Sequence, residues 1–119
     1  MAVAVALLVA ACGGDGDDDA GSLPPEASRG RELVEASGCS TCHSTDGSDS
    51  TGPTWQGLAG AEVTLDDGTT VVADSEYLAR SIREPRAEVV DGFSPVMPTF
   101  DFSEDEVAAI VAYIETLAD

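Results

Sequence analysis

Apolar residues recur at helical spacing in three segments of the chain, and these segments predict three helices. The first spans residues 26–37 and ends at Gly38. The second spans about residues 76–83, with either Asp74 or Ser75 as its N-cap. Leu33 and Val34 are the apolar residues of the first helix, and Pro85 is expected to end the second.

The third predicted helix begins behind the capping box Ser103-Glu104-Asp105-Glu106 and continues to about Ala118. Its apolar face is expected to comprise Val107, Ile110, Val111, Ile114 and Leu117. Between the first two helices, residues 63–72 place β-branched side chains on both sides of Asp67-Gly68, which predicts a β-hairpin with a type I′ turn. The fold class is therefore mainly α with a small β-hairpin.

Residues 39–60 and 89–101 are rich in Gly, Ser, Thr and Pro and predict irregular structure, apart from a short turn near residues 55–58. The chain has 119 residues and only six aromatic ones, all of them after Arg29. That is a thin core for one small domain, and small domains often complete their interior with a disulfide, a metal or a cofactor.

The N-terminal part of the chain indicates export and tethering. The apolar run Ala2–Ala11 is ten residues long, whereas a membrane-spanning helix needs roughly 20. The run suits a signal peptide, and Val9-Ala10-Ala11-Cys12 resembles a bacterial lipobox. We therefore predict a lipoprotein signal peptide at residues 1–11 and lipidation of Cys12. A plain secretory signal with a chance cysteine is the alternative.

Residues 12–25 follow as a Gly- and Asp-rich stretch that carries too little apolar surface to fold, and it is predicted to be a flexible acidic tether. Residues 26–119 then form the single folded domain. With 23 acidic residues, five Arg and no Lys, the formal charge is −18. This charge excludes nucleic acid as a partner, because phosphate binding needs clustered cations. It also requires either a basic partner surface or docking by apolar contacts.

The motif Cys39-Ser40-Thr41-Cys42-His43 carries the chemistry. C-x-x-C-H is the attachment sequence of c-type haem, in which two thiols bond one porphyrin and the adjacent His supplies the proximal nitrogen to iron. A thioredoxin-like site would need a βαβ context, and a zinc site would need four ligands. His43 is the only His in the chain, so the motif favours one covalent haem c.

Elimination gives the second axial ligand. Apart from Met1, which leaves with the signal peptide, Met97 is the only Met. It lies in Pro95-Val96-Met97-Pro98, a stiff segment suited to hold a thioether against iron. The alternative is that Met97 only fills the core.

Gly52-Pro53-Thr54-Trp55 is the third element of the predicted site. A proximal His needs its second ring nitrogen bonded, and the Pro53 carbonyl is our candidate acceptor. Trp55 is expected either to donate its indole N–H to a haem propionate or to pack against the haem edge. Arg80 and Arg83 share a face of the second helix and are expected to pair with nearby acids. The alternative is that they contact the haem propionates or an acid of a partner.

These residues resemble a class I cytochrome c, and more narrowly the cytochrome c domain of subunit II of caa3-type haem–copper oxidases. The residues that carry the resemblance are Gly38 to His43, Gly52 to Leu58, the hairpin Val63 to Val72, Tyr77-Leu78 with Ser81-Ile82, Pro85, Gly92 to Phe102 and Ala112-Tyr113-Ile114. It implies a cytochrome c-like helical fold around one covalent haem. Cys39 and Cys42 would be the thioether attachments and His43 and Met97 the axial ligands, and Gly30 would let the first helix cross the last near Tyr113.

The expected function is one-electron transfer rather than catalysis. The preferred hypothesis is a membrane-tethered respiratory shuttle, held by its lipid on the outer face of a bacterial cytoplasmic membrane. It would take electrons from a quinol-oxidising complex and pass them to a haem–copper terminal oxidase. The alternative is a haem c relay subunit of a larger exported dehydrogenase or reductase.

Overall fold

The computed structural model describes residues 22–118. Within them lie three α-helices, a short 3-10 helix and a two-stranded antiparallel sheet, which confirms the mainly α fold class with a small hairpin. The order is α1 (Pro25–Ser37), η1 (Cys39–Thr41), β1 (Glu62–Thr64), β2 (Thr70–Val72), α2 (Ser75–Arg83) and α3 (Glu104–Glu115). The predicted signal peptide, Cys12 and most of the predicted tether lie outside the described residues.

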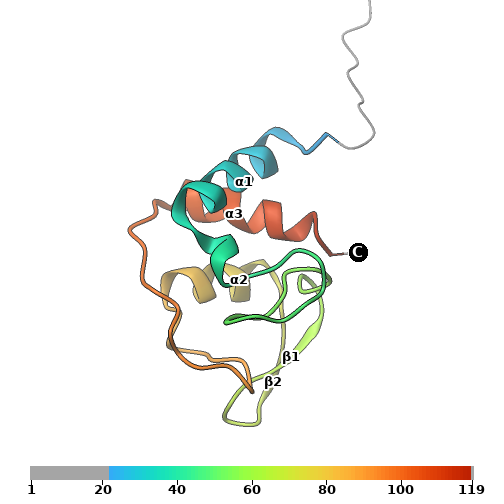
Figure 1. Cartoon of the computed structure of the whole chain (residues 1–119), viewed down its shortest axis with the longest axis vertical. Coiled ribbons are helices and arrows are strands. Elements are labelled where there is room, and N and C mark those ends of the chain that lie inside the picture. Colours follow the sequence, from blue (N-terminus) through green and yellow to red (C-terminus); the bar gives the residue numbers. More distant parts are fainter. Residues whose placement is uncertain (1–21, 119) are drawn as a thin grey trace, which may run out of the picture.

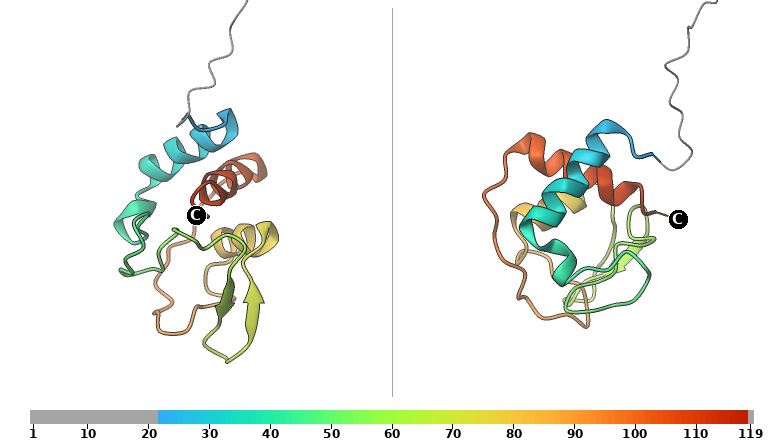
Figure 2. Two further views of the ribbon diagram at one scale, coloured as in Figure 1. Left: turned by 90° about the vertical axis from the view of Figure 1, so that its right-hand side faces the viewer. Right: turned by 45° about the horizontal axis from the view of Figure 1, so that its top comes forward.

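Helices α1 and α3 pack across one another, α2 lies against α3, and the hairpin lies beyond α2 at the far end of the domain (Figures 1 and 2). A long irregular segment, residues 92–101, runs along one side and leads back to α3 (Figure 1). None of the helices among residues 22–118 is long and apolar enough to cross a bilayer.

Local capping signals fix the helix ends, largely as the sequence predicts. α1 stops at Gly38, whose φ of 75° is left-handed and whose N–H bonds to the Val34 carbonyl. α2 uses Asp74 rather than Ser75 as its cap, because the Asp74 carboxylate accepts the Tyr77 N–H at 2.8 Å. The predicted capping box of α3, between Ser103 and Glu106, is complete.

The predicted C-terminal end of α3 is wrong by three residues. α3 ends at Glu115, and Leu117 and Ala118 close in tighter turns whose N–H groups bond to carbonyls three residues back. The Thr116 hydroxyl donates to the Tyr113 carbonyl at 2.6 Å and so competes with the regular helical bond there.

The turn of the hairpin also differs from the prediction. A type I′ turn needs positive φ at both central residues, but Gly68 alone of the hairpin turn has positive φ (86°). The Gly68 N–H bonds to the Leu65 carbonyl at 2.9 Å, and the Asp67 carboxylate accepts the Thr69 N–H at 2.9 Å. The connection is therefore a type I turn followed by a left-handed glycine, in which the Asp67 side chain stabilises its own turn.

The hairpin is attached to the rest of the domain by a backbone pairing that the sequence analysis did not predict. Leu65 forms an isolated antiparallel bridge with Val90. The Asp66 N–H bonds to the Val89 carbonyl at 2.8 Å, and the Asp91 N–H bonds to the Thr64 carbonyl at 3.0 Å. Residues 89–91 thus act as a short third strand and connect the hairpin to the segment that carries Met97.

Gly30 allows α1 and α3 to approach closely. A Cβ added at Gly30 would lie 1.9 Å from the Ala109 carbonyl oxygen and 3.0 Å from the Ile110 nitrogen. The crossing point is therefore at Ala109 and Ile110. The resemblance had placed it near Tyr113, which lies about one helical turn later. Val34, Val107 and Ile110 are fully buried beside this contact and form the centre of the core.

We expect Gly30→Ala to destabilise the protein by about 1–3 kcal/mol or more, because the added carbon overlaps backbone atoms of α3 that cannot rotate away. In an open helix the same change would stabilise by about 1 kcal/mol. Thermal unfolding of Ser28→Ala, at an exposed position of the same helix, is the matched control. Equal stability of the two variants would contradict the close approach.

Candidate functional site

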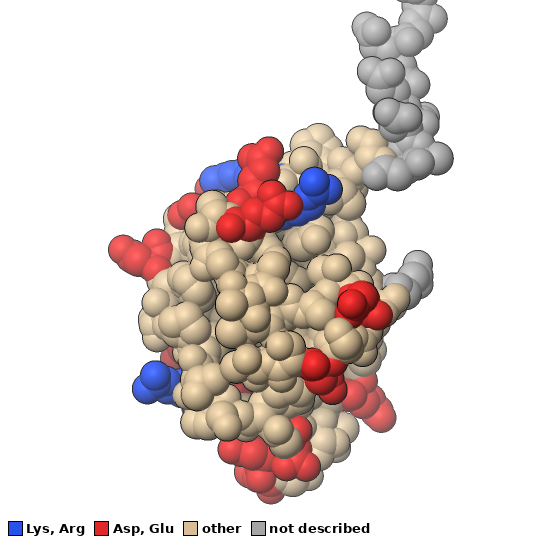
Figure 3. Space-filling model, viewed as in Figure 1, with Lys and Arg blue, Asp and Glu red and all other residues tan. Residues whose placement is uncertain are grey.

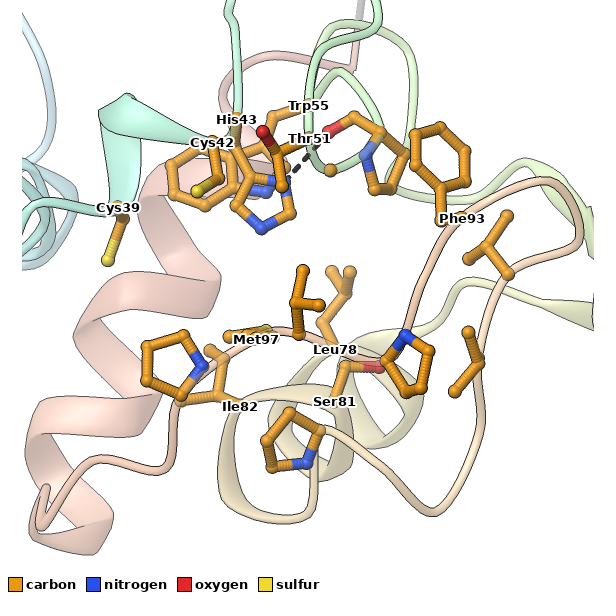
Figure 4. Close-up of a pocket in the computed structure, with 18 of the residues that line it drawn as sticks. Cys39, Cys42, His43, Thr51, Trp55, Leu78, Ser81, Ile82, Phe93 and Met97 are labelled. Atoms are coloured by element: carbon orange, nitrogen blue, oxygen red, sulfur yellow. Dashed lines mark hydrogen bonds between the residues drawn. The ribbon is translucent and has the colours of Figure 1, made fainter.

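The C-x-x-C-H motif forms a tight turn at the end of α1. Gly38 reverses the chain into η1, and the N–H groups of Cys42 and His43 both bond to the Cys39 carbonyl, at 3.2 Å and 3.0 Å. This turn brings Cys39, Cys42 and His43 to the wall of one pocket (Figure 4). Both thiols are free and half-buried. Burial raises the pKa of the Cys39 thiol, so the protonated thiol prevails at neutral pH.

His43 is oriented by the hydrogen bond that the sequence leads us to expect. Its Nδ1 lies 2.8 Å from the Pro53 carbonyl oxygen (Figure 4, dashed line). A carbonyl only accepts, so Nδ1 carries the proton and Nε2 keeps its lone pair. Burial lowers the pKa of His43, and the hydrogen bond to Pro53 opposes that shift. The ring is therefore neutral at pH 7, with a free nitrogen toward the pocket.

The segment that carries Pro53 is paired with the segment that carries His43. The Gly52 N–H bonds to the Cys42 carbonyl, and the Trp55 N–H bonds to the Ser44 carbonyl, both at 2.9 Å. Thr54 strengthens this pairing, because its hydroxyl oxygen accepts the Ser44 hydroxyl at 2.9 Å. The Pro53 carbonyl is thus held in place from both sides along the chain.

Gly52 lies against the face of the His43 ring. A Cβ added there would be 2.6 Å from Cε1, 2.8 Å from Nδ1 and 3.1 Å from Nε2. These distances are so similar that the added carbon would lie over the ring rather than beyond its edge. No side chain fits at this position while the imidazole keeps its place.

Trp55 contacts His43 in a way that the sequence analysis missed. Its indole stacks on the imidazole with ring centroids 5.0 Å apart and an interplanar angle of 17°. Only 5% of Trp55 is exposed. No residue among 22–118 accepts a hydrogen bond from its indole N–H, which leaves that donor free at the pocket wall. The stack exists because residues 42–44 pair with 52–55, and a contact of this kind has no spacing rule in sequence.

The facing wall is formed by α2 and residues 93–98. Leu78 and Ile82 contribute its apolar base, and Met97 lies across the pocket from His43 (Figure 4). Pro95 and Pro98 restrict the backbone on either side of Met97. The structure therefore brings together every residue that the sequence predicts for the site within the described range.

Charge is nearly absent from the pocket lining. Glu88 is the only acidic residue among the lining residues, and Arg80 pairs with it through a hydrogen-bonded ion pair. The sequence analysis predicted pairing with nearby acids without naming Glu88 as the partner. Arg80 connects α2 to the segment that follows it, and so steadies the wall opposite His43.

These groups fit the haem that the C-x-x-C-H motif predicts. An imidazole nitrogen and a thioether sulfur lie on opposite walls of a cavity of about 240 Å³. The Cys42 thiol lies beside the imidazole, and Cys39 lies farther along the pocket wall (Figure 4). The walls are otherwise apolar and suit a porphyrin. Residues 22–118 contain no cluster of three His, Cys, Asp or Glu side chains that could hold a metal ion by itself.

We expect Gly52→Ala to displace His43 and to weaken its hydrogen bond to Pro53, because the new methyl group would occupy the space above the ring. The cost should be about 1–3 kcal/mol of folding stability, measured by thermal unfolding. Ser50→Ala, at an exposed position two residues away, is the control and should unfold like the wild type. A Gly52→Ala protein with unchanged stability and unchanged His43 NMR shifts would contradict this geometry.

Comparison with known proteins agrees with this site. The chain matches the family model described as "Cytochrome c" over residues 27–118. Among solved structures it is similar to cytochrome cH from Methylobacterium extorquens, with a TM-score of 0.58 and 24% identity over 76% of this chain and 97% of that one. Comparison with curated protein sequences gave no significant match. The chain therefore belongs to the cytochrome c family, whose members are electron-transfer proteins that hold haem c by covalent bonds.

Proposed function

We propose that this protein is a one-electron carrier with a single haem c bonded to Cys39 and Cys42 and ligated by His43 and Met97. One observation carries the proposal. His43 and Met97 lie on opposite walls of one apolar pocket, and both cysteines lie on the His43 side. When bound, the haem supplies an iron that alternates between the ferric and ferrous states.

The chain's own residues keep that iron in one coordination state. The Pro53 carbonyl holds the Nδ1 proton of His43, which directs Nε2 into the pocket and increases its basicity. The prolines on either side of Met97 limit how far its thioether moves between oxidation states. With His43 and Met97 both bound to the iron, no position would remain for a small ligand, and this would favour electron transfer over catalysis. The free indole N–H of Trp55 would donate to a haem propionate.

The opening of the pocket is uncharged in an otherwise strongly acidic chain. Three segments border it, residues 36–45, 50–61 and 92–100, and none contains Asp, Glu, Lys or Arg. Each segment has an acidic residue immediately before and after it. Figure 3 shows one face with uncharged surface over its middle and acidic side chains toward its edges. A redox partner would therefore present an uncharged contact region surrounded by basic groups.

The sequence also supports a proposal for the partners and the location. The resemblance to the haem domain of caa3-type oxidase subunit II supports a haem–copper oxidase as acceptor, with a quinol-oxidising complex as donor. The lipobox-like Val9 to Cys12 supports export and lipidation of Cys12, which would hold the carrier on the outer face of the cytoplasmic membrane.

The wild-type haem protein should not bind carbon monoxide, whereas the Met97→Ala variant should bind it. Removal of the thioether leaves the sixth position of the iron open. Absorption spectra of the reduced protein with and without carbon monoxide measure this directly. Val96→Ala removes the exposed neighbouring side chain and should leave the spectra unchanged. Binding of carbon monoxide by the wild type, or none by Met97→Ala, would contradict ligation by Met97.

Electron exchange through the uncharged opening predicts a local charge effect. Ser94→Lys adds one positive charge at the opening, and Ala108→Lys adds the same charge on an exposed position of α3 outside the pocket. At low ionic strength Ser94→Lys should speed electron transfer to hexacyanoferrate(III) roughly twofold to fivefold, with much less effect of Ala108→Lys. Stopped-flow measurements decide, and equal effects of the two variants would exclude exchange at this opening.

A further inference from the structure

The hydrogen bond from His43 to Pro53 does not by itself fix the plane of the imidazole. Hydrogen bonds to carbonyl oxygens tolerate a broad range of angles, so the Nδ1–H donor at 2.8 Å leaves the ring free to tilt. The direction in which Nε2 approaches the iron depends on that tilt. A second contact on the ring is needed to set it.

The indole of Trp55 is that second contact. The two rings are nearly parallel, at 17°, and their centroids are 5.0 Å apart. A tilt of the imidazole would break this stack, and aromatic pairs contribute about 0.5–1.5 kcal/mol beyond the area that they bury. Gly52 adds a boundary, because its backbone approaches the imidazole face closely enough to exclude even a methyl group.

Other contacts of Trp55 hold its indole in one orientation. Its backbone N–H bonds to the Ser44 carbonyl at 2.9 Å, and its backbone carbonyl accepts the Leu58 N–H at 3.2 Å. Its ring and that of Tyr113 form a T-shaped pair with an interplanar angle of 85° and centroids 6.3 Å apart. The indole is thus fixed by its own backbone and by α3, independently of His43.

We infer that Trp55 is a positioning residue whose stacked indole sets the plane of the His43 imidazole and therefore the orientation of the axial ligand at the iron. The inference rests on the proposed role of His43 as ligand. It is separate from the proposed hydrogen bond to a propionate, since the stack uses the face of the indole and the hydrogen bond uses its N–H. Another flat aromatic side chain at position 55 could perform part of this stacking role.

The test is the orientation of His43 in the reduced, diamagnetic haem protein, measured by nuclear Overhauser contacts between its ring protons and the haem meso protons. The wild type should show one set of contacts, together with contacts between the rings of Trp55 and His43. Trp55→Phe keeps a flat ring and no N–H, and it should preserve the set of haem contacts. Trp55→Leu should broaden the His43 ring signals or shift their contacts to other meso protons.

Two controls separate positioning from general stability. Ile110→Val, in the core beside Gly30, lowers the melting temperature without touching His43 and should leave all haem contacts unchanged. Tyr113→Phe keeps the edge contact with Trp55 and should do the same. The inference is overturned if Trp55→Leu loses stability but keeps the wild-type contact pattern. It is also overturned if the wild type lacks contacts between the Trp55 and His43 rings, a measurement that needs no variant.

Failure of the ligand assignment looks different. A wild-type protein that binds carbon monoxide would reject the His43/Met97 pair, whatever the orientation of the ring. The Trp55 variants are therefore compared with the wild type only in protein that retains covalent haem and does not bind carbon monoxide. In that protein a change of ring orientation reports on Trp55 alone.

Discussion

The pairing of residues 42–44 with residues 52–55 is the contact on which the site depends. Two backbone hydrogen bonds, from Gly52 to Cys42 and from Trp55 to Ser44, place the Pro53 carbonyl at Nδ1 of His43. The same pairing puts the indole of Trp55 on the imidazole. Hydrogen bond, stack and close approach of Gly52 are thus three consequences of one register. A shift by one residue would remove all three, because it would move Gly52, Pro53 and Trp55 together relative to the imidazole.

The distribution of charge solves a problem that the composition creates. A formal charge of −18 keeps the chain soluble but repels acidic partners and costs folding energy wherever acids crowd together. The three segments that border the pocket contain none of the chain's acids. Glu88, the one acid in the lining, is neutralised by Arg80. Long-range attraction to a basic partner and short-range apolar contact then act on different parts of the surface and do not oppose each other.

The sequence predicts the features that depend on neighbours in the chain. Gly38 caps the C-terminus of α1, and the capping box of Ser103 and Glu106 begins α3. Both are predictable because each capping motif acts within one helical turn. The contact of His43 with Pro53 was also accessible, since the chemistry of a proximal His demands an acceptor and a Gly-Pro turn offers one nearby. The turn type at Gly68 was missed because a type I turn with a following glycine and a type I′ turn share the Asp-Gly signal. The bridge of Leu65 to Val90 and the stack of Trp55 on His43 depend on distant segments, for which a single sequence holds no local signal.

The segment that carries Met97 shows how the fold and the cofactor depend on each other. Residues 92–101 lie in neither a helix nor a strand. Local hydrogen bonds, such as that from the Val96 N–H to the Ser94 carbonyl at 2.8 Å, and the stack of Phe100 on Phe102 support them. Pro95 and Pro98 compensate for the absence of regular secondary structure in this segment. A proline reduces the conformations open to the unfolded chain and so lowers the entropy lost when the segment becomes ordered. The backbone hydrogen bonds that these residues make within the described part of the chain are all local, and a bond from Met97 to the iron would add a long-range contact. Since such a bond exists only in the folded, haem-bound state, it would couple binding of the cofactor to folding of this wall. The thin aromatic core is then sufficient, because the porphyrin between the two walls completes it.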